Sequence, residues 1–162
     1  MILSTHGIVG AAIIKIMPTH PVIGGILAFL SHFAMDAIPH WDYHLESFER
    51  NPDPMKTNVR INRAFLKDFI KISLDASLGI LLPLIIFKGT SPWLIAMGAA
   101  LAILPDALQF AYFKIKKEPL SSLQRFHIWA HSKNPELRTE PVIGPALQAS
   151  LLITILYLLG NL

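Results

Sequence analysis

Hydrophobic residues gather into five long segments, and polar residues lie between them. The segments cover residues 2–17, 21–38, 70–87, 92–113 and 141–159. Each approaches the ~20 apolar residues that a helix needs to cross a bilayer. The first segment is the shortest and could instead be interfacial or re-entrant. Prolines at several segment ends fit helix boundaries, because the residue before a proline avoids the helical region. The pattern predicts an all-α fold, a multi-helix membrane bundle of about five apolar helices.

Composition strengthens the membrane interpretation. The 162 residues are 52% hydrophobic and 15% charged, whereas soluble domains usually carry about 25% charged residues. The length suits one domain, so residues 1–162 are interpreted as a single membrane-embedded helical domain. The first segment lacks a basic start and a small-residue cleavage site, which favours a retained helix over a signal peptide.

Basic residues concentrate in two polar stretches. Residues 45–71 and 114–140 each hold six Lys or Arg, and the short turns between apolar segments hold almost none. Because Lys and Arg favour the cytoplasmic face, both stretches are expected inside the cell, with the N-terminus inside and the C-terminus outside. The protein is therefore expected to be a multi-pass protein of the cell (inner) membrane. No feature points to nucleic acid, and the oligomeric state is open, a homo-oligomer included.

One run of basic residues has a helical spacing. Arg60, Arg63, Lys67 and Lys71 follow steps of three and four, so they would share one face of a helix that leads into the third segment. The stripe could simply face water or lipid headgroups. It could also clamp an anionic substrate.

Ionisable side chains lie inside the apolar segments, where they are costly and by default functional. His32 and Asp36 are four positions apart and share a helix face. In the expected topology, these two residues, His6 and Asp106 all fall near the cytoplasmic ends of their helices. Asp75 lies at the same depth, although it could instead pair with Lys71. Small residues every fourth position, ending at His32 or Asp106, would let these helices pack closely.

More candidate ligands lie in the two basic stretches. His40, Asp42 and His44 alternate, so an extended loop would point them the same way. His127 and His131 are spaced as two metal ligands on one helix, as in an HExxH motif that lacks its glutamate. His20 and His44 are interpreted as ordinary loop histidines.

Together these residues form a set large enough for two metal ions. The chain has no cysteine, so any metal must be held by histidine and carboxylate, which suit Zn²⁺ and also Mn²⁺ or Fe²⁺. Asp36 or Asp42 could serve as general base. Asp42 could also orient a ligating histidine or cap the loop. His32 and Asp36 could instead form a simple hydrogen-bonded pair. The predicted metal ligands are His6, His32, Asp36, His40, Asp106, His127 and His131.

Short motifs add a resemblance to a known family. "THGIVGAAI" near the start, "LPD" at 104–106 and "HIWAHS" at 127–132 resemble the YdjM-like family of inner-membrane metal-dependent hydrolases, which is similar in motif to zinc-dependent phospholipase C. The resemblance implies that His6, Asp106, His127 and His131 are metal ligands. "HFAMD" is similar to the HxxxD element of zinc phospholipases and implies His32 and Asp36 as well.

The leading functional hypothesis is metal-dependent hydrolysis of an ester or phosphoester, in a lipid or another anionic amphiphile. Arg125, Lys133, Arg60 and Arg63 could hold the phosphate. No serine or threonine lies in a recognisable nucleophile motif, so water is the expected nucleophile. The alternatives are a metal-ion transporter or sensor, a non-catalytic helical membrane scaffold, and a soluble or monotopic helical protein.

Overall fold

The computed structural model describes residues 1–131 and 142–160, and this part of the chain is mainly helical. The prediction of an all-α fold is therefore confirmed. The helices are α1 (Leu3–Ile16), α2 (Pro21–Asp36), α3 (Arg63–Ile86), α4 (Pro92–Ile115), α5 (Leu120–Ala130) and α7 (Ile143–Gly160). A small antiparallel hairpin is formed by β1 (Phe48–Glu49) and β2 (Asn58–Val59), with a 3₁₀ turn η1 (Pro54–Lys56) between its strands.

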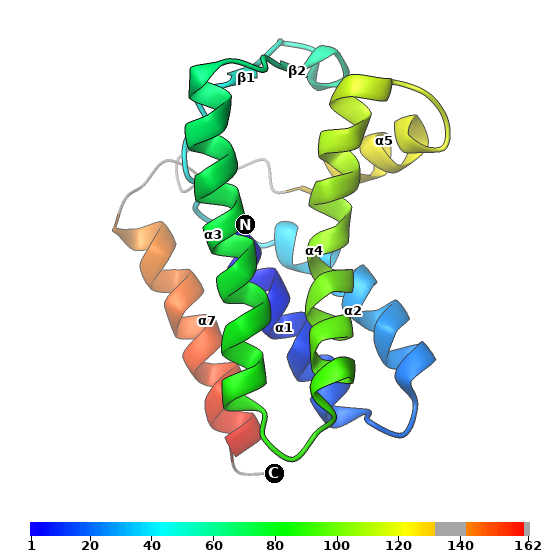
Figure 1. Ribbon diagram of the computed structural model, residues 1–162, viewed down its shortest axis with the longest axis vertical. Coiled ribbons are helices and arrows are strands. Elements are labelled where there is room, and N and C mark those ends of the chain that lie inside the picture. Colours follow the sequence, from blue (N-terminus) through cyan, green and yellow to red (C-terminus); the bar gives the residue numbers. More distant parts are fainter. Residues whose placement is uncertain (132–141, 161–162) are drawn as a thin grey trace.

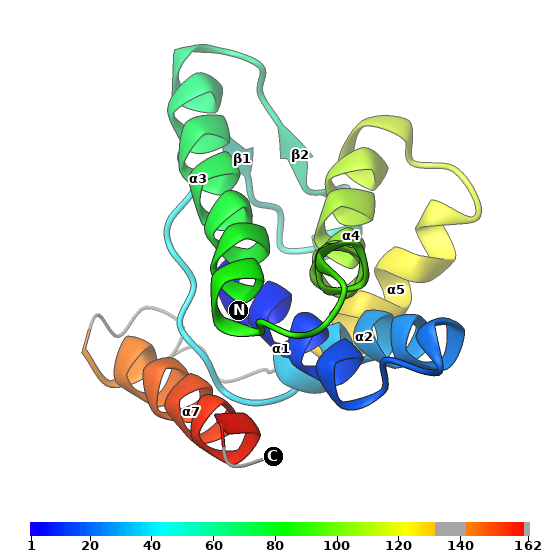
Figure 2. The same ribbon diagram turned by 60° about the horizontal axis from the view of Figure 1, so that its bottom comes forward.

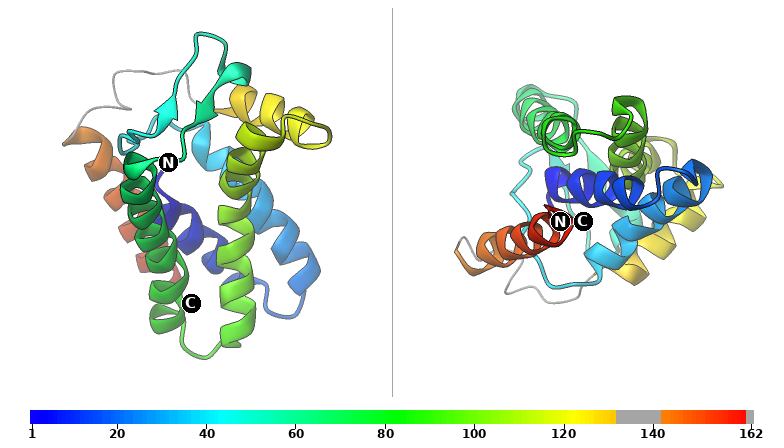
Figure 3. Two further views of the ribbon diagram at one scale, coloured as in Figure 1. Left: turned by 45° about the horizontal axis from the view of Figure 1, so that its top comes forward. Right: turned by 90° about the horizontal axis from the view of Figure 1, so that it is seen from below.

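The long helices α3 and α4 stand side by side and run in opposite directions (Figure 1). A short turn joins them at one end, and the hairpin and α5 lie at the other. Helix α1 lies against both and also contacts α2 and α7, so that it occupies the centre when the molecule is seen from below (Figures 2 and 3). The stretch rich in Lys and Arg before α3 and the described part of the second one, residues 114–131, thus lie at the same end of the molecule.

Helix α1 can occupy the centre because it carries glycine at the points where α3 and α4 cross it. A Cβ atom at Gly10 would lie 2.4 Å from the carbonyl oxygen of Gly98 in α4, and one at Gly7 would lie 2.5 Å from that of Gly79 in α3. Such distances are far below any real contact, so only glycine fits. The close packing expected of the small residue Gly98 is confirmed, and it brings α4 directly onto α1.

Only two of the apolar helices reach the length expected of a membrane span. Among the described residues, α3 and α4 have 24 residues each and are long and apolar enough to cross a bilayer. Helices α1, α2 and α7 have 14, 16 and 18 residues, shorter than the ~20 residues that a spanning helix needs. Many large apolar side chains on the outer faces of α2, α3 and α7 are exposed.

The region before α3 departs from the sequence prediction. Helix α3 begins at Arg63, where the side chain of Asn62 accepts a hydrogen bond from the Phe65 amide at 3.0 Å and caps the helix. The predicted basic stripe therefore loses Arg60, which lies beside the hairpin and pairs with Glu49. The hairpin packs through Val59 against an aromatic cluster at the end of α4, a long-range contact with no signal in the local pattern.

Candidate metal centre

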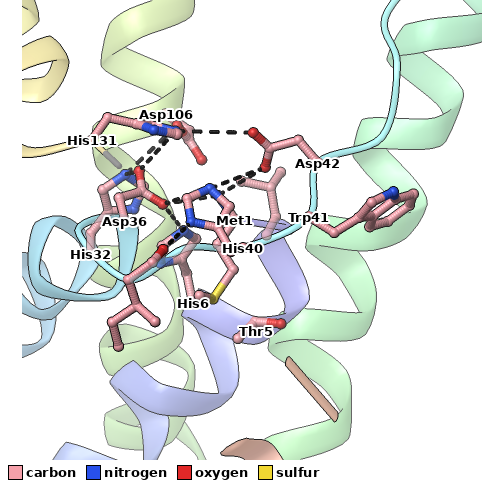
Figure 4. Close-up of polar contacts among 12 residues, drawn as sticks. Met1, Thr5, His6, His32, Asp36, His40, Trp41, Asp42, Asp106 and His131 are labelled. Carbon is pink, nitrogen blue, oxygen red and sulfur yellow. Dashed lines mark hydrogen bonds and ion pairs between the residues drawn. The ribbon is translucent and has the colours of Figure 1, made fainter. Parts of the chain in front are cut away.

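Histidine and aspartate side chains from five parts of the fold converge beside the start of α1 (Figure 4). We call this group the His/Asp cluster. Helices α1, α2, α4 and α5 and the segment after α2 all contribute to it. Its members are His6, His32, Asp36, His40, Asp42, Asp106, His127 and His131.

Asp36 lies at the middle of the His/Asp cluster and is 1% exposed. Its Oδ2 atom lies 3.0 Å from Nε2 of His127 and 3.3 Å from Nε2 of His32. Its Oδ1 atom faces the opposite side, 3.2 Å from Nε2 of His6 and 3.8 Å from Nε2 of His40. One carboxylate therefore presents a separate oxygen to each of two histidine pairs.

Two overlapping sets of residues have the geometry of a metal site. One ligand atom from each of His32, Asp36, Asp106 and His127 lies within 4.8 Å of the others. The same holds for a second set, which is Asp36, His40 and His131. The sets share Asp36, and together they contain six of the seven predicted ligands. The seventh, His6, touches Asp36 from α1.

Backbone carbonyls fix the orientation of two cluster histidines. Nδ1 of His32 lies 2.9 Å from the carbonyl oxygen of Ala102, and Nδ1 of His40 lies 2.7 Å from that of Ile38. A carbonyl oxygen only accepts, so Nδ1 is the protonated nitrogen in each ring. The lone pair of Nε2 then points into the cluster, which is the arrangement that metal-ligating histidines show.

His6 is fully buried, yet neither of its ring nitrogens makes a hydrogen bond in the described structure. Its ring stacks on that of His32, with the centroids 4.0 Å apart. A buried polar atom without a hydrogen bond costs free energy and calls for an explanation. A cation between His6 and Asp36 would give Nε2 of His6 a partner.

The His/Asp cluster has a buried floor and a more open side. His6, His32, Asp36 and His127 are buried, whereas Asp106, Asp42 and His131 keep 27%, 21% and 18% of their side chains exposed. In the part of the chain that the structure describes, these three residues form the exposed side of the cluster.

The amino group of Met1 lies within the cluster. It is 2.9 Å from Oδ1 of Asp36, 3.0 Å from Oδ1 of Asp42 and 2.7 Å from Nε2 of His40. Burial alone would lower the pKa of this group, but the nearby carboxylates outweigh burial and raise it. The cluster thus holds one ammonium against three carboxylates when its histidines are neutral, and this balance favours the binding of further positive charge.

Several sequence predictions are corrected by the local structure. Helix α5 ends at Ala130 and His131 is its C-cap, but the amide of His131 still donates to the carbonyl oxygen of His127 at 3.0 Å, so the predicted i,i+4 spacing is kept and both residues reach the cluster. Asp75 does not pair with Lys71, whose ammonium lies 3.9 Å from Asp68. Asp75 instead accepts hydrogen bonds from the backbone of α1. His44 is exposed, whereas His40 is buried.

The predicted substrate-binding residues lie on the surface. Arg125 is exposed on α5, and Arg63 is exposed at the start of α3. Arg60 is paired with Glu49 near the hairpin. Lys133 lies outside the described residues.

Two contacts of the cluster region were missed by the sequence analysis. The amide of Gln148, buried in α7, donates to the carbonyl oxygen of Trp41 at 2.6 Å and holds the segment after His40. The side-chain amide of Gln109 lies 3.5 Å from Nδ1 of His127. A glutamine in an otherwise apolar segment was the available signal for Gln148, because a buried amide requires a partner.

The fold and the cluster together define the class of this protein. It is an all-α protein with two helices of membrane-spanning length and a buried group of histidines and aspartates that could hold a metal ion. Comparisons with protein-family models, with curated proteins and with solved structures found no match to this chain.

Proposed function

We propose that this chain is a membrane-bound, metal-dependent hydrolase that cleaves an ester or phosphoester bond in a lipid or another anionic amphiphile. The observation that carries the proposal is the convergence of His32, Asp36 and His127 with Asp106 from three helices. Zn²⁺ fits this donor set best, and Mn²⁺ and Fe²⁺ share its preference for nitrogen and oxygen. A second ion, at Asp36, His40 and His131, would have to displace the ammonium of Met1 from Asp36 and His40.

The donor set fits a metal in three further respects. His32 and His40 are oriented by backbone carbonyls, His6 is buried without a hydrogen bond, and carboxylates exceed the ammonium in number. The motif resemblance to the YdjM-like family, stated above, marks His6, Asp106, His127 and His131 as ligands, and all four side chains lie in the cluster.

A bound metal ion of this kind acidifies water and polarises the bond to be cleaved. The aspartates of the cluster would then have two different roles, metal ligand and general base. Asp36 is buried among histidines and serves best as a ligand. Asp42 lies at the open side, 3.5 Å from Nε2 of His40, and is better placed to accept a proton from water. We therefore assign the general base to Asp42.

Apolar surface around the cluster supports an amphiphilic substrate. The outer faces of α2, α3 and α7 expose many Leu, Ile, Val and Phe side chains, which lipid would cover. We assign the protein to the inner membrane as a multi-pass protein, with the hairpin, α5 and the His/Asp cluster toward the cytoplasm. Arg60, Arg63, Arg125 and Lys133 would attract the anionic headgroup to that face.

A metal-ion transporter is the main rival, and it needs ligands along a path through the protein. Below the cluster, the core between α1 and α4 consists of apolar residues such as Ile14, Ile95 and Ala99. Among the described residues, this apolar core offers no metal ligands along a path through the protein, which favours a site at one end of the helices. A transport assay in liposomes loaded with a metal-sensitive dye would detect the rival directly.

Hydrolysis is tested with the purified full chain in detergent micelles that contain a phosphoester lipid analogue. We expect product release that a chelator abolishes and that Zn²⁺ or Mn²⁺ restores. His127→Ala should remove the activity, because it removes a ligand from the centre of the site. His20→Ala is the matched control, since His20 is exposed at the other end of α2. Activity that resists the chelator, or equal losses in both variants, would contradict a metal mechanism.

A further inference from the structure

Helix α1 carries His6, yet its first turn has no local cap. The N-cap residue is Ile2, whose side chain cannot accept a hydrogen bond. The first amides of a helix need acceptors from elsewhere. Here the acceptor is Asp75, in the middle of α3 and about seventy positions away along the chain. Its Oδ2 atom accepts from the amide of Leu3 at 2.6 Å, and its Oδ1 atom accepts from that of Ser4 at 3.1 Å.

The same carboxylate also holds the segment after α2. The hydroxyl group of Tyr43 donates to Oδ2 of Asp75 at 3.3 Å. Burial raises the pKa of Tyr43, and the charge of Asp75 raises it further, so the phenol stays protonated and remains a donor. Tyr43 directly follows Asp42, and His40 lies only three positions earlier. Asp75 therefore joins α3 to two parts of the chain that supply the His/Asp cluster.

We infer that Asp75 is a positioning residue that sets the place of His6 through α1, and of His40 and Asp42 through Tyr43. This inference rests on the proposed metal site and adds a residue that is not itself a ligand. A negative charge at a helix N-terminus is stabilising as well as a good acceptor. Because the carboxylate of Asp75 belongs to α3, it fixes the position of α1 relative to α3. A cap from within α1 would only satisfy the first amides of that helix.

Neighbouring residues of α3 hold other segments of the chain, so the contact with the start of α1 belongs to Asp75. One and two turns before Asp75, Lys71 donates to the carbonyl oxygen of His44 at 2.9 Å, and Asp68 accepts from the amide of Ser47 at 2.7 Å. Asp68 makes the same type of contact as Asp75, a carboxylate accepting from backbone, but it holds the entrance to the hairpin. It provides a matched control.

The first test is hydrogen exchange of backbone amides in the full chain, treated with chelator. Asp75→Asn should expose the amides of Leu3 and Ser4 to exchange and loosen residues 40–44. Asp68→Asn should affect only residues near Ser47, and Tyr43→Phe only the 40–44 segment. If Asp75→Asn leaves the start of α1 protected, or opens the whole molecule, the inference fails.

The second test is titration with Zn²⁺ in a double-mutant cycle. Removing a partner that orients metal ligands typically weakens metal binding about 10- to 100-fold, so we expect at least a tenfold loss for Asp75→Asn and less than a twofold change for Asp68→Asn. In a His6→Ala background the effect of Asp75→Asn should shrink, because part of it acts through His6. Full additivity, or equal losses in both aspartate variants, would overturn the inference. A wild-type chain that binds no Zn²⁺ would refute the proposed function, while the exchange pattern would still decide the role of Asp75.

Discussion

Helices α1 and α3 are both apolar, but they are buried to opposite extents. Ten of the 14 residues of α1 are buried, whereas α3 buries three of its 24 residues, namely Asp68, Gly79 and Pro83. None of those three is a large apolar side chain. The large side chains of α3, such as Leu74 and Leu81, point outward.

The difference teaches that hydropathy does not distinguish a core helix from a helix whose large apolar side chains are exposed. Small residues make the distinction here, because Gly7 and Gly10 let α3 and α4 approach the axis of α1. The two helices also differ in the role of their polar side chains. Helix α1 buries His6 in the cluster, and α3 turns Asp75 inward to hold α1.

The largest effect is expected where α1 is packed most tightly. In Gly10→Leu, the new side chain would begin 2.4 Å from the Gly98 carbonyl oxygen, so we expect a loss of about 3 kcal/mol or more. The measurement is thermal unfolding in detergent. Ser77→Leu adds the same bulk to an exposed site on α3 and should be tolerated. Comparable losses in both variants would contradict the central position of α1.

The next largest effect concerns the polar group of α1. His6→Ala should weaken Zn²⁺ binding about 100-fold, close to 2.7 kcal/mol, because it removes a ligand that faces Asp36. Metal-free stability should also fall, by about 2 kcal/mol or more, because the change leaves a cavity where a fully buried ring stacks on that of His32. Titration with Zn²⁺, followed by unfolding in chelator, separates the two effects. Unchanged affinity would exclude His6 from the site.

A smaller effect is expected at the contact between α7 and the cluster region. Gln148→Leu leaves the carbonyl oxygen of Trp41 without its donor, and an unsatisfied buried group costs about 1–3 kcal/mol. We expect a value near the lower end, together with faster exchange of amides around Trp41. Ser150→Ala is the control, because Ser150 is exposed and bonds only within α7 in the described structure.

The smallest effect is expected on the outer face of α3. Leu81→Ser, at a side chain that is 55% exposed, should change stability in detergent by less than about 0.5 kcal/mol. Its effect should appear in membrane insertion, which favours leucine over serine. A large loss in detergent would contradict the exposure of this face and would revise the contrast between the two helices.

Local pattern was sufficient to predict most of the helices and most of the cluster. The apolar runs located α1, α2 and α4 within a few residues, and the i,i+4 spacing placed His32 and Asp36 on one face. The expectation that acids and histidines of separate helices share one depth led to Asp106 and His6, which do converge.

The remaining features depend on contacts between distant residues. The sequence alone left Asp75 between an ion pair and a metal ligand, and the structure shows a third role that only the position of α1 creates. The hairpin forms because Val59 finds an aromatic cluster at the far end of α4. The partner of Asp75, the start of α1, and the partner of Val59, the end of α4, are both far away in the sequence. Local sequence pattern therefore identifies neither of them.

The position of Asp36 between His6 and His127 has a consequence for the order of assembly during synthesis. Helix α1 leaves the ribosome first and α5 more than a hundred residues later, and domains form as synthesis proceeds. Until α5 emerges, Asp36 lacks His127, its nearest histidine in the finished site. The cluster can therefore be completed only after α5 has been made, so a chain interrupted before α5 would leave Asp36 without its nearest histidine in an otherwise apolar bundle.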